Sequence, residues 1–297
     1  MTRWLVTGAG GMLGQDLTGL LRAGGEDFTG LDRGELDVTD AGAVADAVRA
    51  EQPDIVVNCA AWTAVDDAEA HEDLARAVNT AGAANVAAAC AAAGAWLVHP
   101  STDYVFSGSA ARPYSEDFPA DPRTAYGRTK LAGEQAVLGL LPQAGYVLRT
   151  AWLYGAHGPN FVRTMIRLEG SRDTVAVVDD QHGQPTWTGD VASQIVLLAR
   201  SGAAPGIYHA SAAGATTWYG LARAVFGLLG ADPARVRPTT SSEMVRPAPR
   251  PAYSVLGHAR WAAAGLPPLP DWADALRAAF PAIAAVEGRQ PVSQGRG

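Results

Sequence analysis

The chain has 297 residues, of which 48% are hydrophobic and 18% charged, an ordinary globular composition with enough length for a large core. Its formal net charge is -7 and no run of Lys or Arg occurs, so we expect no nucleic-acid partner. No apolar run approaches membrane-spanning length, and the N-terminus lacks a signal-peptide pattern. We therefore expect a cytoplasmic protein that does not bind membranes.

The two cysteines and six histidines show no metal-binding spacing. Cys59 lies in an apolar, strand-like run and Cys90 in an alanine-rich, helix-like run. We expect both to be buried space-filling side chains and predict no metal site.

The first half of the chain alternates short apolar runs with longer helical patterns. The runs that predict strands are Trp4–Thr7, Phe28–Leu31, Asp54–Cys59, Trp96–His99 and Tyr146–Leu148. The stretches that predict helices are Met12–Arg22, Ala41–Ala50, Leu74–Ala93 and Ala125–Leu141. This alternation predicts an α/β, Rossmann-like, doubly wound parallel sheet, and we assign residues 1–152 to a dinucleotide-binding domain.

After Thr150 the pattern becomes less regular. Helical stretches continue at Asn160–Leu168, Asp190–Ala199 and Tyr219–Leu229, and short strands are predicted at Val175–Val178 and Ile207–His209. We assign residues 153–285 mainly to a smaller C-terminal substrate lobe, some of whose elements can return to the first domain. The polar segment 286–297 is expected to be disordered.

A glycine-rich turn follows the first predicted strand. Gly8 permits a tight turn, Gly11 lets the backbone approach a pyrophosphate, and Gly14 lets the following helix pack close to the strand. Asp32 ends the second strand, where a carboxylate accepts hydrogen bonds from ribose hydroxyls. Arg33 follows it and favours a 2′-phosphate instead, so this pair leaves NADH and NADPH both open.

A phenol, an ammonium and a hydroxyl form the predicted catalytic group. Tyr126 and Lys130 share one helical face, where the ammonium is expected to lower the Tyr126 pKa. Tyr126 can then donate a proton near neutral pH. Thr102 follows the fourth strand, where loop residues face a cofactor, and its hydroxyl can hydrogen-bond a substrate carbonyl.

The order of these motifs resembles that of the extended short-chain dehydrogenases/reductases, and further segments resemble the dTDP-4-dehydrorhamnose reductase family. The resemblance covers roughly residues 3 to 280. The segments are Asn58–Asp66, His99–Phe106, Tyr126–Glu134, Leu148–Gly155, Asp179–Thr186 and Arg250–Ser254.

The resemblance implies a role for each matching residue. Tyr126 is implied as proton donor, Lys130 as its partner and ribose anchor, and Thr102 as the hydroxyl that tunes Tyr126. Asp103 and Trp152 are implied to contact the sugar. The expected cofactor-binding residues are Gly8, Gly11, Met12, Leu13, Gly14, Asp32, Arg33, Asp37, Val38, Ala60, Ala61, Thr63, Tyr126 and Lys130.

The chain departs from the family at two places. Trp62 replaces the usual His before Thr63, and Trp187-Thr188-Gly189-Asp190 stands where some members hold magnesium between two subunits. A homodimer is therefore left open.

The implied activity is reduction of the C4 ketone of a dTDP-4-keto-6-deoxyhexose, with dTDP-4-dehydrorhamnose first among the candidates. NADPH is the expected cofactor, with NADH also accepted. Three alternatives stay open: a related deoxysugar 4-ketoreductase or dihydrostreptose-type synthase, an epimerase or dehydratase of the same class, and a regulatory subunit that binds a dinucleotide without catalysis.

Overall fold

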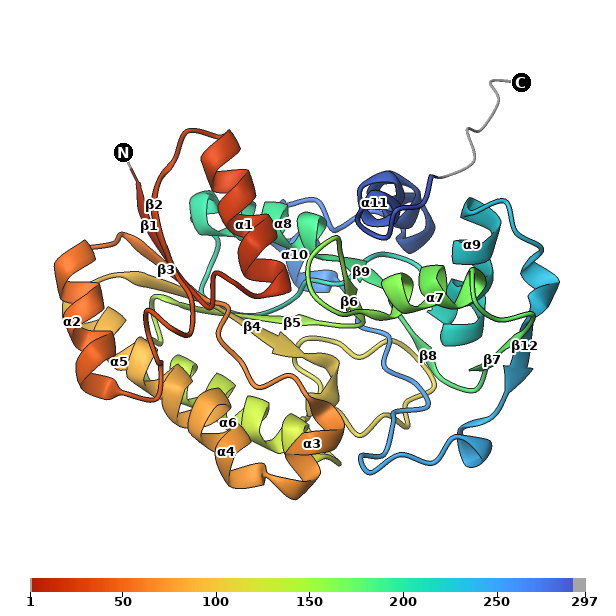
Figure 1. The fold of residues 1–297 in the computed structure, drawn as a ribbon. Coiled ribbons are helices and arrows are strands. Elements are labelled where there is room, and N and C mark those ends of the chain that lie inside the picture. Colours follow the sequence, from red (N-terminus) through yellow and green to blue (C-terminus); the bar gives the residue numbers. More distant parts are fainter. Residues whose placement is uncertain (1, 291–297) are drawn as a thin grey trace.

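A six-stranded parallel sheet forms the centre of the larger lobe (Figure 1). The computed structural model describes residues 2–290. The strand order is β10-β5-β4-β3-β1-β2, and every neighbouring pair is parallel. The strands are β1 (Arg3–Thr7), β2 (Asp27–Leu31), β3 (Ile55–Asn58), β4 (Trp96–Thr102), β5 (Gly145–Thr150) and β10 (Gly206–His209). The predicted α/β, Rossmann-like architecture is confirmed.

Helices cover both faces of this sheet, as Figure 1 shows. Trp4 and Val6 pack toward one face and the intervening Leu5 toward the other, which explains why the strand reads as a continuous apolar run. On the first face lie α1 (Met12–Ala23), α8 (Thr188–Ser201) and α10 (Ala259–Ala263). On the second lie α2 (Ala41–Glu51), α5 (Ala83–Ala93) and α6 (Ala125–Leu140).

The helix predicted at Leu74–Ala93 is longer than expected and is not uniform. It begins with α4 (Glu72–Arg76), passes through a π-helical turn at Ala77–Gly82 and continues as α5; the short helix α3 (Val65–Ala70) precedes it. The π turn carries Asn79, whose amide exchanges hydrogen bonds with the backbone N–H and carbonyl of Trp62 at 2.9 and 3.1 Å. The turn therefore fixes the loop after β3.

The smaller lobe contains α7 (Phe161–Glu169), α9 (Trp218–Leu228), α11 (Trp272–Val286) and the parallel pair β7 (Val175–Val178) and β12 (Val236–Thr239). Short ladders join β6 (Leu153–Tyr154) to β9 (Thr186–Trp187), and β8 (His182–Gly183) to β11 (Thr216–Thr217). Short 3-10 turns occupy Asp103–Val105, Pro233–Arg235 and Ser241–Glu243. Strand β10 and helix α8 return from this half of the sequence to the central sheet.

The segment 286–297, for which we expect disorder, is described as far as Gln290. Glu287 accepts hydrogen bonds from Arg163 at 2.5 Å and from Arg167 at 2.7 Å, so it is fixed against α7. The remaining residues, 291–297, lie outside the described part of the chain.

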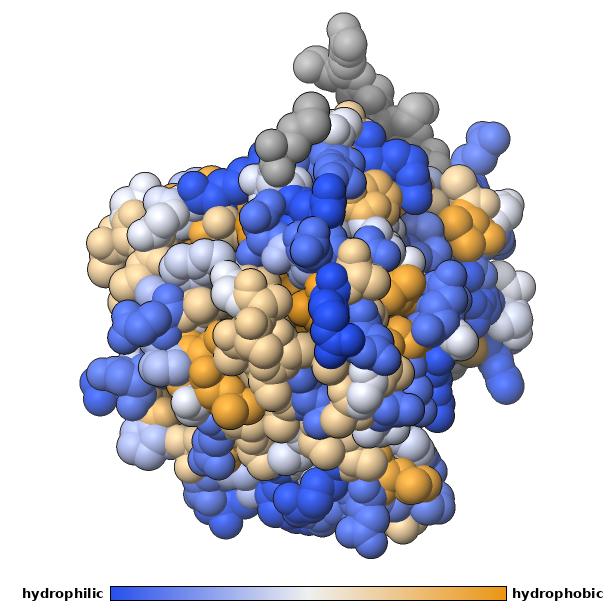
Figure 2. All heavy atoms as spheres, turned by 90° about the vertical axis from the view of Figure 1, so that its left-hand side faces the viewer, coloured by the Kyte–Doolittle hydropathy of each residue, from blue (hydrophilic) through white to orange (hydrophobic). Residues whose placement is uncertain are grey.

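The face in Figure 2 carries hydrophilic residues around an area near its middle where hydrophobic residues adjoin one another. Among residues 2–290, no helix combines the length and apolar character needed to cross a membrane.

A buried ion pair joins α6 to the sheet. Arg149 at the end of β5 donates to Glu134 of α6 with Nε at 3.0 Å and Nη2 at 2.7 Å, and the two side chains are 3% and 2% exposed. Ser101 of β4 donates to the same carboxylate at 2.5 Å. One carboxylate therefore ties two strand ends to one helix.

We predict that Glu134→Ala lowers the free energy of unfolding by about 3–5 kcal/mol, because it leaves the Arg149 charge buried and unpaired. Chemical denaturation measures this loss. The control is Asp46→Ala, which breaks the exposed Arg49–Asp46 pair, with side chains 72% and 74% exposed, and should cost less than about 1 kcal/mol. The loss in Glu134→Gln should lie between the losses in the two alanine variants. Equal losses in the Glu134 and Asp46 alanine variants would contradict this account.

Candidate active site

Two adjoining cavities lie beyond the carboxyl ends of the strands, where β1 has β2 on one side and β3 on the other. Such a reversal of strand order is where doubly wound sheets bind ligands. The cavities measure about 390 and 440 Å³ and share Gly11, Cys59 and Ala61.

Every site residue expected from the sequence lines one of these two cavities. The first is lined by Gly8, Gly11, Asp32, Arg33, Asp37, Val38, Ala60 and Ala61. The second is lined by Gly11, Met12, Leu13, Gly14, Ala61, Thr63, Thr102, Asp103, Tyr126, Lys130 and Trp152. Residues from five strand ends and loops therefore converge on one cleft.

The glycine turn packs too closely for side chains at two positions. Gly8 has φ +66°, and a Cβ there would lie 2.5 Å from the Ala60 nitrogen. A Cβ at Gly14 would lie 2.4 Å from the Gly8 carbonyl oxygen. At Gly11, the N-cap of α1, a Cβ would meet only the Gly8 oxygen, at 3.2 Å. The helix N-terminus thus faces the cleft without a side chain in front of it, which fits a bound pyrophosphate.

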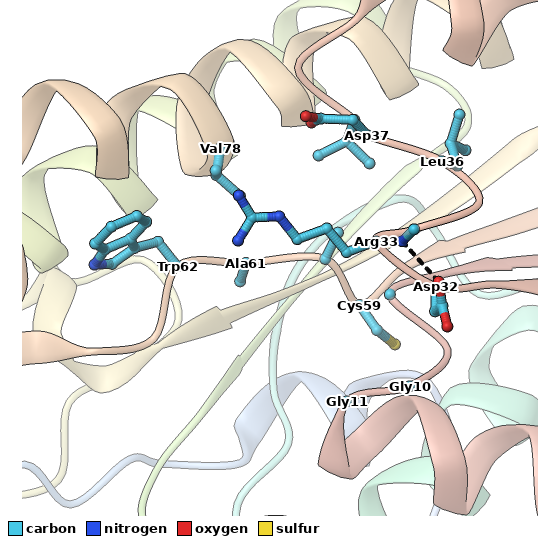
Figure 3. A pocket seen from close by; sticks show the side chains of 14 residues that line it. Gly10, Gly11, Asp32, Arg33, Leu36, Asp37, Cys59, Ala61, Trp62 and Val78 are labelled. Atoms are coloured by element: carbon cyan, nitrogen blue, oxygen red, sulfur yellow. Dashed lines mark hydrogen bonds between the residues drawn. The ribbon is translucent and has the colours of Figure 1, made fainter.

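The side chains of Asp32 and Arg33, which both line the first cavity, point in different directions (Figure 3). The Asp32 carboxylate accepts hydrogen bonds from the N–H groups of Gly34 at 2.7 Å and Glu35 at 3.2 Å. The exposed Arg33 side chain extends across the cavity toward Val78 and Ala61. The Asp32 turn therefore presents the Arg33 guanidinium to whatever occupies this cavity.

Asp37 lies nearby on the cavity wall. Its carboxylate accepts hydrogen bonds from the Thr39 N–H and hydroxyl, which hold the pKa of Asp37 below its usual value. It is therefore anionic at neutral pH.

Cys59 is not only the space-filling side chain that we expected. It is half-buried and lines both cavities, because it follows β3 at the reversal of strand order. Burial raises the pKa of its thiol to about 12, so the thiol is neutral. Cys90 is fully buried, as predicted.

Lys130 is almost fully buried on the inner face of α6. Its ammonium nitrogen donates to the Pro100 carbonyl at 2.7 Å and lies 3.4 Å from Nε2 of His99. His99 in turn lies 3.3 Å from the Asn58 amide nitrogen. Burial lowers the pKa of Lys130 to about 8, so the amine keeps most of its charge at neutral pH.

The expected direction of the Tyr126 pKa is wrong. Burial raises the pKa of Tyr126 to about 12, although a hydrogen bond with Thr102 lowers it in part. Burial outweighs the helical proximity of Lys130, whose ammonium points to Pro100 and His99 instead. Tyr126 therefore holds its proton firmly.

Asp103 offers an unused acceptor beside these groups. Its Oδ1 accepts a hydrogen bond from the Thr102 hydroxyl at 3.0 Å, whereas neither its buried Oδ2 nor the neighbouring buried Ser254 hydroxyl makes a hydrogen bond. Burial raises the pKa of Asp103 to about 6. A buried carboxylate oxygen without a partner is costly, which favours a ligand hydroxyl at this position.

Trp152 lines the same cavity as Thr102, Tyr126 and Lys130, and its neighbour in space was not predicted from the sequence. The indole of Trp152 stacks on Trp218, with ring centroids 3.7 Å apart and planes 7° from parallel. Trp218 begins α9 in the smaller lobe and also lines the cavity. No local pattern around Trp218 links it to Trp152, so only the folded chain reveals this pair.

A third cavity, of about 400 Å³, shares Tyr104 and Trp218 with the second. It has apolar walls from α7 and β7, and Arg246 and Arg250 lie at its edge. Arg250 donates to the Asp66 carboxylate from both terminal nitrogens at 2.8 Å, which connects this segment to α3. Among the residues described, no group of three His, Cys, Asp or Glu side chains is placed to bind a metal.

Comparison with known proteins agrees with this geometry. A family model described as RmlD substrate binding domain matches residues 2–284. A dTDP-4-dehydrorhamnose reductase of Streptomyces griseus is 61% identical over 291 residues, which cover 97% of this chain and 96% of the relative. A dTDP-4-keto-6-deoxy-D-glucose reductase of Streptomyces niveus is 55% identical, with coverage of 96% and 99%.

Solved structures show the same likeness. A dTDP-4-dehydrorhamnose reductase from Bacillus anthracis in complex with NADP has a TM-score of 0.91 at 38% identity and covers 94% of this chain and 99% of its own. Since the family model and these relatives span nearly the whole sequence, the chain belongs to the dTDP-4-dehydrorhamnose reductase family.

Proposed function

We propose that this protein is an NADPH-dependent reductase of the C4 ketone of a dTDP-4-keto-6-deoxyhexose, with dTDP-4-dehydrorhamnose as the first candidate substrate. The observation that carries the proposal is the convergence of Thr102, Tyr126 and Lys130 on one cavity that adjoins the glycine-turn cavity. The similar relatives named as reductases of such sugars support the same substrate class.

The residues of the first cavity fit a nicotinamide dinucleotide. The bare N-terminus of α1 at Gly11 suits its pyrophosphate, and Arg33 suits a 2′-phosphate. The related Bacillus anthracis structure contains NADP. When bound, the reduced cofactor supplies the hydride that the sugar carbon receives.

The side chains of this protein supply the proton and the positioning. Tyr126 is protonated at neutral pH and would donate its proton to the carbonyl oxygen as that oxygen gains negative charge. Thr102 lines the same cavity as Tyr126, and its hydroxyl would hold the same oxygen in line. The buried Lys130 charge lies one helical turn after Tyr126 and would favour the phenolate that remains, although in this structure its ammonium donates to Pro100 and lies beside His99.

The remaining walls fit the two other parts of the substrate. The unpaired Oδ2 of Asp103 would accept a sugar hydroxyl, and the Trp152 ring would cover an apolar sugar face. The third cavity would take the nucleotide, with apolar walls for the base and guanidinium groups at its edge for the diphosphate. We further propose a cytoplasmic location. We also propose a homodimer, whose molecular mass light scattering would measure.

The relative that is named for a 4-keto-6-deoxyglucose favours a second candidate, a 4-ketoreductase of another deoxysugar. A panel of 4-keto nucleotide sugars decides between them, with NADPH oxidation followed optically and the C4 configuration of the product determined. Oxidation with none of these sugars would contradict both candidates and favour a regulatory subunit. Cofactor that stays bound through dialysis would point to an epimerase.

We predict that Tyr126→Phe lowers kcat by a factor of about 100 to 10,000, because the proton donor is lost. The dissociation constant of NADPH, measured by fluorescence titration, should change little. A phenylalanine variant with a nearly normal rate would refute the assigned role.

The sugar's KM should rise as the pH falls through about 6. Asp103 has a raised pKa in the folded protein, so it is a carboxylate above that pH and a weaker acceptor once protonated. Initial rates between about pH 5 and pH 7.5 measure this dependence. In Asp103→Asn, KM should be high throughout and should not follow pH in this range. An asparagine variant with the wild-type dependence would exclude Asp103 as its source.

Both cofactors should support turnover, with kcat/KM for NADPH at least equal to that for NADH. Arg33→Ala should lower kcat/KM about tenfold for NADPH and little for NADH, because only NADPH carries the 2′-phosphate. Arg49→Ala, which removes an exposed charge from α2 away from the cavity, is the control. A hundredfold preference of the wild type for NADH would refute this prediction.

A further inference from the structure

Trp152 has an unusual backbone conformation for a bulky side chain. Its φ is +48°, in the left-handed region that glycine and asparagine adopt more readily. Such conformations are destabilising unless surrounding contacts enforce them, and they concentrate at functional sites. The contacts that hold Trp152 are therefore informative about the site.

Two residues of the smaller lobe hold its ring. Trp218 covers one face of the indole in the near-parallel stack described above. The backbone of Gly183 also touches the ring: a Cβ at this position would lie 2.4 Å from Cε2, 2.6 Å from Cζ2 and 2.7 Å from Nε1. The Trp152 ring therefore fits only because residue 183 is a glycine.

One small ladder fixes both of these neighbours. Thr216 pairs with Gly183 and Thr217 with His182 in the antiparallel ladder of β11 and β8. The Thr217 hydroxyl also accepts the Gly220 N–H at 3.0 Å, which caps α9, and donates to Asp179 at 2.6 Å. Trp218, the next residue, is thus held rigidly relative to Gly183.

We propose that Trp218 is a positioning residue that, with Gly183, fixes the Trp152 ring as the sugar-facing wall of the cavity. This inference rests on the proposed function. It gives a role to the segment Asp179–Thr186, to which no catalytic role is assigned: its glycine gives the ring room and its ladder places the stacking partner. Trp218 also lines the third cavity, so the stack separates the sugar from the nucleotide position.

Binding of dTDP-rhamnose, measured by calorimetry in the presence of NADPH, tests this inference without turnover, because a C4 alcohol cannot accept a hydride from the reduced cofactor. Trp218→Leu should weaken dTDP-rhamnose about tenfold while the dissociation constant of NADPH stays within about twofold. Trp218→Phe should restore most of the affinity, since it keeps a stacking ring. Trp272→Phe, which replaces a half-buried tryptophan outside the stack, is the control and should bind as the wild type does.

Circular dichroism tests the stack itself. Two parallel indoles this close should give an exciton couplet, which Trp152→Phe and Trp218→Phe should each abolish and Trp272→Phe should preserve. Gly183→Ala should weaken the couplet and the sugar affinity together, because its methyl group displaces the ring.

Unchanged dTDP-rhamnose affinity in Trp218→Leu, or a couplet that persists in both Trp152→Phe and Trp218→Phe, would overturn the inference. Failure of the proposed function gives a different result. In that case NADPH is not oxidised, but the couplet and the binding of dTDP-rhamnose still change in the variants as described.

Discussion

Glu134 lies one helical turn after Lys130, and its carboxylate accepts hydrogen bonds from Ser101 and Arg149. These partners directly precede Thr102 and Thr150 on neighbouring strands. The Arg149 and Glu134 side chains are almost completely buried, so removal of either one would leave the other charge unpaired and without water to solvate it. Because the same helix carries Tyr126, this carboxylate helps to set the relative positions of hydroxyl, phenol and ammonium, together with contacts such as that of Lys130 with Pro100. The hydrogen bonds of Glu134 with Ser101 and Arg149 hold helix α6 against the ends of β4 and β5.

The Trp152 wall of the second cavity depends on a different constraint, the passage of the chain from the central sheet to the smaller lobe. Trp152 leaves β5 of the central sheet, whereas its stacking partner and Gly183 belong to the smaller lobe. The ladder of β6 and β9 adds backbone pairing next to this point. Arg250 and Asp66 connect the two halves again on the other side of the cavity. The cavity walls are therefore built from segments that are distant in sequence and are tied together at several places.

Local sequence patterns were sufficient for the parallel sheet, the glycine turn and the Tyr126–Lys130 spacing, whereas the resemblance to the family supplied the other residues expected to line the two cavities, such as Asp37, Asp103 and Trp152. Strand ends and a Tyr-x-x-x-Lys spacing are short-range features, and parallel strands bring their carboxyl ends together automatically. The Trp152–Trp218 stack, the Glu134–Arg149 pair and the π turn were not predictable, because each joins residues or backbone shifts that no short pattern encodes. The prediction of a lowered Tyr126 pKa was wrong for a related reason. Burial raises this pKa more than a nearby ammonium lowers it, and the spacing of residues in the sequence does not reveal burial.

Burial also explains the charge states on which the proposed chemistry depends. It keeps Tyr126 protonated, lowers the pKa of Lys130 to about 8 and raises the pKa of Asp103 to about 6. The central claim is that this site delivers a hydride to the sugar C4 and a proton to its oxygen. The most direct test supplies dTDP-4-dehydrorhamnose with NADPH deuterated at the transferable C4 position and examines the product by NMR. The account predicts one deuterium at the sugar C4 for each NADPH oxidised. Deuterium at another carbon, or no oxidation of NADPH, would contradict it.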